Sequence, residues 1–316
     1  MVQVNWPIAG HKKIVEFLQK SIANNRLAHA YLFYGSQNVG KGLVALNFIS
    51  EILTKNSIGR DKNLIQEQIR QKSHPDVFWI EKLENKRNIS IDQVRDLRIN
   101  LNLSPFSNGH KIVIINNAEE LSEAAANSFL KILEETPSKT IIILLVNNLK
   151  RILPTITSRC QLIKFNPVPL EEIKKFLVNK LKVKAGEAEI LSQLSFGRPG
   201  LIVDWLEQKE KSKEYQQQIK FFIKIINGTL HEKINFVSQI EDVPFFAWQI
   251  ILRDMLLFKN NLPIINSEIK ISIERLIGKW SEEKIYAAIK SLERTEKLFR
   301  FNINKKLALE NFFINL

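Results

Sequence analysis

Short apolar runs separated by helical patterns constrain the fold of this chain more than any other feature. The runs are "AYLFY" (30–34), "VFWI" (77–80), "KIVII" (111–115), "TIIILLV" (140–146) and "QLIKF" (161–165). Continuous β-branched and aliphatic runs are typical of strands that are covered on both faces. The helical patterns between them predict βαβ units, because parallel strands need a crossover connection. The first half of the chain is therefore expected to form a doubly wound α/β domain around a parallel sheet.

Two helices have boundaries that can be read from their flanking residues. "SIDQVRDLRINL" opens with Ser90 and Gln93 at the spacing of a capping box, in which each side chain satisfies a free backbone N–H. "LSEAAANSFLKILEETP" has Ser122 in the position of an N-cap and Pro137 just beyond its expected end. Both segments are predicted to be helices.

The pattern changes after "FNPVP" (165–169), beyond which no further strand is predicted. From residue 170 onward the chain shows successive amphipathic helices. Breaks are expected at "FGRPG" (196–200), "NGT" (227–229) and "NNLP" (260–263). The second half is therefore expected to be all-α.

The segment "YGSQNVGKG" (34–42) nearly spells a phosphate-binding P-loop, whose pattern is G-x-x-x-x-G-K-[ST]. Gly35, Gly40 and Lys41 are in register, but Gly42 stands where the magnesium-binding hydroxyl is expected. A strand precedes the segment and a helix follows it, so backbone N–H groups and a helix N-terminus would face a phosphate. These residues predict P-loop ancestry.

Hydrolysis requires more than this loop. Phosphoryl transfer needs magnesium, held by the loop hydroxyl and by an acid at the end of a neighbouring strand, and a carboxylate that orients water. Gly42 cannot ligate a metal through a side chain, and the run "KIVII" ends in the neutral amides Asn116 and Asn117. The missing hydroxyl and the missing acidic residues are two independent losses, and together they predict that the chain does not hydrolyse ATP.

Cysteine and histidine usage bears on metal sites and on the compartment. The single cysteine, Cys160, excludes an internal disulfide and a multi-cysteine zinc site. None of the five histidines has metal-ligand spacing to another, and His29, His74 and His110 are expected in loops or at strand edges. The longest apolar run is too short for a membrane span, and no signal peptide is visible. We expect a cytoplasmic protein without a metal site.

The net charge of +13 suggests nucleic acid as a partner, because clustered Lys and Arg bind phosphate backbones. Many lysines, however, are interleaved with glutamates, as in "EEIKKFLVNKLKVKAGEAE". A generally basic, solvated surface is favoured over a dedicated DNA-binding patch.

Four segments carry a resemblance to a known family. They are "HAYLFYGSQNVGKG", "VIINNAEELSEAAANSFLKILEETP", "ILPTITSRCQLIKF" and "NKKLALENFFINL". Together they resemble the clamp-loader branch of the AAA+ ATPases, within it the delta prime group of bacterial DNA polymerase III. The likeness runs along essentially the whole chain, and the middle two segments are the most specific. Where that family has "IDEADKLT", Asn116 and Asn117 replace the acidic pair. Delta prime subunits commonly have such decayed nucleotide sites, so the departure favours them over motor subunits.

The resemblance implies roles for several residues. In "SRC", Arg159 matches an arginine that reaches the ATP of the adjacent motor subunit, and Pro154 would begin a short helix that leaves Arg159 exposed. Asn147 matches a polar sensor residue next to the nucleotide. The alternative is an ordinary turn residue at the end of a strand. Arg198 matches the second sensor of the lid domain, with an ordinary turn arginine as the alternative. Cys160 is expected to be a small buried residue without special reactivity.

A three-part organisation follows from the resemblance. It comprises an AAA+ P-loop domain (1–166), a helical lid (167–208) and a helical collar for oligomerisation (209–316). The second boundary is expected in the polar stretch "EQKEKSKEYQQQ", with a long continuous helix through it as the alternative. Motor subunits and many delta prime subunits carry a four-cysteine zinc module after the first helix. Residues 51–76 contain no cysteine, so the module has either been lost or was never present.

The implied function is that of a stationary clamp-loader subunit. It would join motor ATPase subunits and delta in a hetero-pentameric ring, help to open the sliding clamp and load it on primed DNA. No cofactor is required, although the retained loop leaves weak ATP or ADP binding open. Two alternatives remain: an active ATPase motor subunit of the clamp loader, and a basic DNA-binding protein.

Overall fold

A computed structural model of the chain describes residues 6–55, 62–106, 109–137, 139–240, 243–262, 264, 269–299 and 304–316. Contacts between Cα atoms divide it into two compact units. The first comprises residues 1–185 and 195–200, and the second comprises residues 186–194 and 201–316. The division into P-loop domain, lid and collar stays a prediction.

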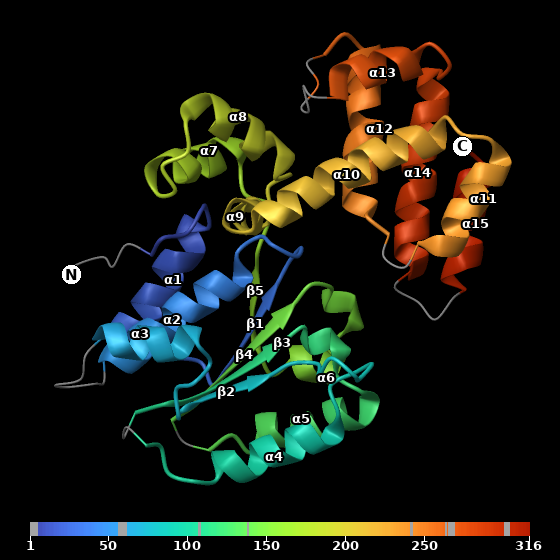
Figure 1. Cartoon of the computed structure of the whole chain (residues 1–316). Helices are drawn as coiled ribbons and strands as arrows, with labels where there is room; N and C mark the ends of the chain where they lie inside the picture. The colour runs from blue at the N-terminus through green and yellow to red at the C-terminus, as the bar shows by residue number, and fades with distance from the viewer. Residues whose placement is uncertain are drawn as a thin grey trace. The chain divides into compact units, whose positions relative to one another are not determined.

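A parallel five-stranded sheet forms the centre of the first unit (Figure 1). Its strands are β1 (Ala30–Tyr34), β2 (Val77–Ile80), β3 (Lys111–Asn116), β4 (Thr140–Val146) and β5 (Gln161–Lys164). They lie in the order β2-β3-β4-β1-β5, and every neighbouring pair is parallel. The predicted strands and the predicted α/β class are confirmed, with two strand ends displaced by one residue.

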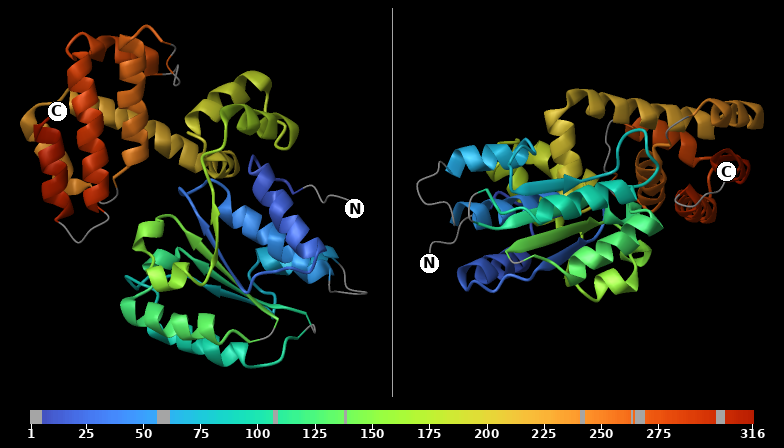
Figure 2. Two further views of the ribbon diagram at one scale, coloured as in Figure 1. Left: turned by 180° about the vertical axis from the view of Figure 1, so that it is seen from behind. Right: turned by 90° about the horizontal axis from the view of Figure 1, so that it is seen from below.

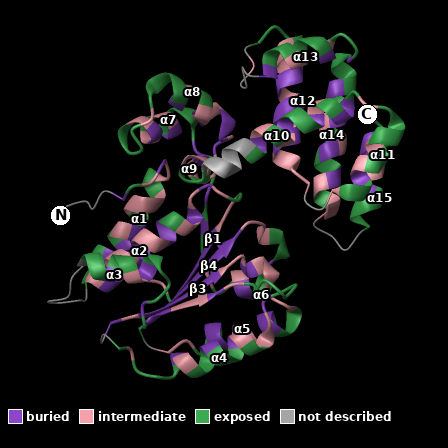
Figure 3. Cartoon of the chain, in the orientation of Figure 1, coloured by how far each residue is buried: buried purple, intermediate pink, exposed green. Residues whose placement is uncertain are grey.

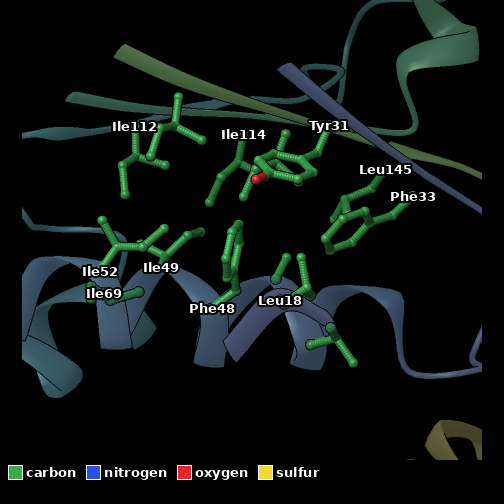
Figure 4. Close-up of a cluster of buried hydrophobic side chains, with 14 of the residues drawn as sticks. Leu18, Tyr31, Phe33, Phe48, Ile49, Ile52, Ile69, Ile112, Ile114 and Leu145 are labelled. Carbon is green, nitrogen blue, oxygen red and sulfur yellow. The ribbon is translucent and has the colours of Figure 1, made fainter. Parts of the chain in front are cut away.

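Helices cover both faces of this sheet. On one face lie α1 (Lys12–Ala23), α2 (Lys41–Lys55) and α3 (Lys62–Arg70), and on the other lie α4 (Ile91–Leu101), α5 (Glu123–Glu134) and α6 (Pro154–Thr157). Adjacent residues of β3 point to opposite faces, so that Ile114 joins the first cluster and Ile115 the second. Figure 4 shows the first cluster, in which Phe48 packs beneath Tyr31 and Ile114. Two separate apolar cores thus hold the sheet.

The predicted helix starts are confirmed by their hydrogen bonds. Ser90 and Gln93 form a complete capping box at the start of α4. The Ser122 side chain accepts a hydrogen bond from the backbone N–H of Ala125 at the start of α5. Pro154 is the first residue of α6, where its missing N–H costs nothing.

Beyond β5, the regular elements among the described residues are all helices. Its helices are α7 (Leu170–Asn179), α8 (Ala185–Leu194), α9 (Pro199–Glu207), α10 (Lys209–Ile226), α11 (Leu230–Gln239), α12 (Phe245–Lys259), α13 (Lys270–Ile277), α14 (Glu282–Phe299) and α15 (Lys305–Ile314). The three predicted breaks all separate helices. A further break at Gln208 separates α9 from α10 in the polar stretch.

Aromatic rings fill the interior of the second unit. Trp248 of α12 is fully buried, and its ring stacks on Phe222 of α10 with centroids 4.7 Å apart. Phe312 and Phe313 of α15 approach the same tryptophan at 6.0 and 5.4 Å. Figure 3 shows the buried residues on the inward sides of α12 and α14. Burial of these large rings stabilises the helical unit.

Within the described part of the chain, no helix has both the length and the hydropathy to span a bilayer. The same residues contain no cluster of three or more His, Cys, Asp and Glu side chains that could hold a metal ion.

Candidate functional site

The turn that follows β1 has the backbone of a P-loop. Gly35 has a φ of +153°, and a Cβ built there would lie 2.2 Å from the carbonyl oxygen of Phe165. Gly40, with a φ of +107°, directly precedes α2. Both positions therefore require glycine. Gly35 is needed because the Phe165 backbone approaches closely, and Gly40 is needed because its φ is one that other residues rarely adopt.

Lys41 is the first residue of α2, and its ammonium group is held by the loop itself. Its Nζ donates to the carbonyl oxygens of Gly35 and Ser36, each at 2.7 Å, and to Asn147 Oδ1 at 2.9 Å. The residue is only 7% exposed. Burial lowers the pKa of Lys41 to about 8, and the nearby Glu119 carboxylate opposes this shift. All three N–H donors of the ammonium group are thus satisfied within the chain.

A network of amides continues from Lys41 across the ends of the strands. Asn147, which follows β4, donates from Nδ2 to Asn117 Oδ1 at 2.7 Å. The backbone N–H of Asn147 donates to Glu119 Oε1 at 2.9 Å. Asn117 adopts a left-handed conformation, with φ 50°, which Asn tolerates better than most residues. The structure therefore brings Lys41, Asn117, Glu119 and Asn147 together.

A pocket of about 330 Å³ opens beside this network. Its lining includes Lys41, Gly42, the three amides Asn116, Asn117 and Asn147, and Gly200 of α9. The backbone N–H of Gly200 donates to the carbonyl oxygen of Asn38 at 2.9 Å, which ties the P-loop to the "FGRPG" turn. Predicted site residues from three separate segments thus share one pocket.

The side chains of this pocket do not fit a magnesium nucleotide complex. A Cβ built on Gly42 would have no heavy atom within 4 Å, so the place of the usual hydroxyl is open space. Asn116 and Asn117 present neutral amides, which supply a cation with no negative charge. Glu119 is the carboxylate of the network. Its Oε1 accepts the Asn147 backbone N–H, its Oε2 is buried without a hydrogen-bond partner among the described residues, and it is not among the residues that line the pocket. The backbone shape of a P-loop is thus combined with a glycine at position 42 and with amides at positions 116 and 117.

Arg198 lies in the turn between α8 and α9, where its backbone N–H donates to the carbonyl oxygen of Ser195. Its side chain is half-buried. Among the described residues that line the P-loop pocket, Gly200 is present and Arg198 is not. Its role as a second sensor stays a prediction.

Arg159 lies at the opposite end of the sheet from the P-loop. It follows α6 and precedes β5, whose Gln161 is paired with Tyr31 near the start of β1. The P-loop follows the other end of β1, and strands rise by about 3.3 Å per residue. Arg159 therefore cannot serve the P-loop of its own chain without rearrangement of the sheet.

The environment of Arg159 agrees with the expected exposed helix end. Its side chain is 38% exposed, and Nη2 lies 2.7 Å from Glu134 Oε1. The neighbouring Cys160 is half-buried, and burial raises the pKa of its thiol to about 12, so a reactive thiolate is disfavoured.

Two acidic residues of these sites were missed by the analysis of the sequence. Glu119 stands two residues after Asn117 in "NNAEE", and this spacing was a signal that it would lie near the strand ends. Glu134 carried no such signal, because its partner Arg159 is 25 residues away and depends on the packing of α5 against α6.

The chain is similar in sequence to subunits of bacterial DNA polymerase III. A family model for "DNA polymerase III, delta subunit" matches residues 10–169. DNA polymerase III subunit delta' of Haemophilus influenzae is 31% identical over 250 residues, 75% of this chain and 74% of that protein. Subunit delta' of Bacillus subtilis is 24% identical over 96% of this chain and 95% of its own length.

Among solved structures, a DNA polymerase III gamma-subunit-related protein of Thermotoga maritima has a TM-score of 0.44 at 21% identity. The match covers 94% of this chain and 97% of that one. The extent of the family model and the Haemophilus relative show that this chain belongs to the DNA polymerase III delta-subunit family of bacterial clamp-loader subunits.

Proposed function

We propose that this chain acts in DNA replication as a clamp-loader subunit that does not hydrolyse ATP. The observation that carries the proposal is a P-loop pocket with open space at Gly42 and neutral amides at Asn116 and Asn117. Hydrolysis needs a metal and a carboxylate that orients water, and these side chains supply neither. The Lys41 network also occupies the donors that would otherwise bind phosphate. ATP or ADP would bind weakly, in competition with the loop's own carbonyls.

Arg159 is the proposed contribution of this subunit to catalysis. It would reach the ATP of an adjacent motor subunit and stabilise charge on the transferring phosphoryl group, a role in which arginine fingers are worth about 10³–10⁵ in rate. Its exposure, and its place at the sheet end opposite the P-loop, support action in trans.

The partners proposed for this subunit are the motor ATPase subunits and delta, assembled as a hetero-pentameric ring through the helices of the second unit. The ring would open the sliding clamp and load it on primed DNA. Asn147 and Arg198 would be remnants of the sensors, of which Asn147 now binds Lys41.

The test is steady-state ATP turnover by the cognate motor subunits, with clamp and primed DNA, reconstituted with the wild-type chain or with Arg159→Ala. We expect turnover to fall by about 10²-fold or more with the complex still assembled. An unchanged rate would remove the arginine-finger role.

Two further measurements address the remaining alternatives. Robust turnover by the isolated chain would identify an active ATPase. Tight binding of the isolated chain to DNA, with a steep salt dependence, would favour a DNA-binding protein.

A further inference from the structure

We infer that Glu134 is a positioning residue for Arg159, an inference that rests on the proposed function of Arg159. Glu134 is the last residue of α5, and α5 packs against the short helix α6 that precedes Arg159 (Figure 2). The carboxylate therefore comes from an element that is anchored in the core of the α/β unit, since Phe129 and Leu133 of α5 are buried.

Two contacts fix the guanidinium of Arg159. Nη2 donates to Glu134 Oε1 at 2.7 Å, and Nη1 donates to the carbonyl oxygen of Thr155 at 3.0 Å. Two bonds from different nitrogens of a planar group define both its position and the orientation of its plane. Without these contacts, the long arginine side chain would be free to adopt several rotamers. It would then lose that conformational entropy when it binds a phosphate.

The arrangement leaves the guanidinium able to bind a further anion. Arginine has five N–H donors, and these two bonds use one on each terminal nitrogen. No other hydrogen bond of the Arg159 side chain occurs among the residues that the structure describes. Glu134 therefore holds the arginine in place rather than consuming its donors, which is the condition for preorganised stabilisation of charge.

Stability is a poor explanation for this ion pair. The side chains of Arg159 and Glu134 are 38% and 49% exposed, and ion pairs at such positions contribute little to folding. A variant of Glu134 should thus assemble normally, and its effect would be confined to catalysis in the neighbouring subunit.

The adjacent residue provides a matched control. Glu135 follows α5 directly and pairs with Arg98 of α4, with Nη2 and Oε2 3.3 Å apart. Glu135→Gln removes the same charge, one residue away, without touching Arg159. Any general effect of charge at this helix end would appear in both variants.

The experiment compares complexes reconstituted with the wild-type chain, Glu134→Gln, Glu135→Gln and Arg159→Ala. We expect Glu134→Gln to lower the kcat of ATP turnover about 10-fold at unchanged KM, since misplacement of a catalytic group costs rate rather than ground-state binding. Glu135→Gln should stay within about 2-fold of wild type, and melting temperatures should agree within about 2 °C.

The outcomes separate this inference from the proposed function. Equal rates for Glu134→Gln and Glu135→Gln, together with a large loss in Arg159→Ala, would overturn the positioning role and leave the arginine finger intact. Faster ATP turnover with Glu134→Gln than with the wild type would mean that the carboxylate holds Arg159 back from the phosphate. That outcome would also overturn the inference. No loss in Arg159→Ala would overturn the proposed function itself.

Discussion

The ammonium group of Lys41 lies 2.9 Å from the side-chain oxygen of Asn147, although 106 residues separate the two in the sequence. With the loop carbonyls of Gly35 and Ser36, this contact completes the hydrogen bonding of a nearly buried lysine. The amide of Asn147 in turn donates to Asn117 at the end of the next strand. The P-loop is thus held in shape by its own chain.

Removal of the Asn147 side chain is expected to destabilise the fold by about 1–3 kcal/mol, because it removes one of the three acceptors of the Lys41 ammonium group and the donor to Asn117 Oδ1. The measurement is denaturant unfolding of Asn147→Ala. Asn148→Ala serves as the control, since the Asn148 side chain accepts from the backbone N–H of Lys150 and the loss of such a cap costs about 1 kcal/mol. Equal losses in the two variants would contradict a special role for the network.

The two loop glycines should respond in opposite ways to alanine. Gly42→Ala is expected to stabilise the chain by about 0.4–1 kcal/mol, because the methyl group meets open space and the unfolded chain loses freedom. Gly35→Ala is expected to destabilise it by about 1–3 kcal/mol, because its Cβ would lie 2.2 Å from a backbone oxygen. Thermal unfolding of both variants checks the pair, and a destabilised Gly42→Ala would show that the space beside α2 is not open.

Stability should depend on pH through Lys41. Its pKa is about 8 in the folded chain, against 10.5 when it is solvated. Between these values the unfolded chain binds more protons at Lys41 than the folded chain, so Lys41 makes stability rise with pH. The slope is at most about 1.4 kcal/mol per pH unit.

Other groups titrate over the same range, and Lys41→Met isolates the contribution of this one. The free energy of unfolding of the wild type, relative to Lys41→Met, should be larger at pH 10 than at pH 7. A difference that does not change with pH would mean that burial does not depress the pKa of Lys41.

Much of the architecture could be predicted from short segments of the chain. All five strands, the capping box of Ser90 and the proline start of α6 lie where the patterns placed them. These features depend on backbone hydrogen bonding and side-chain periodicity within a few residues, so a short window contains their cause. The same applies to the absence of a hydroxyl at position 42 and of a carboxylate at position 116, because Gly42 and Asn116 can be read directly from the sequence.

The contacts that define the two sites depended on the order of the strands. Asn147 reaches Lys41 because β4 lies beside β1, a neighbourhood that the sequence of the elements does not specify. Glu134 reaches Arg159 because α5 and α6 pack on the same face of the sheet. The residue patterns thus determined the fold class, the glycines and lysine of the P-loop and the family likeness. Only tertiary packing decided which side chains hold Lys41 and Arg159, because each of those contacts joins segments that no local interaction brings together.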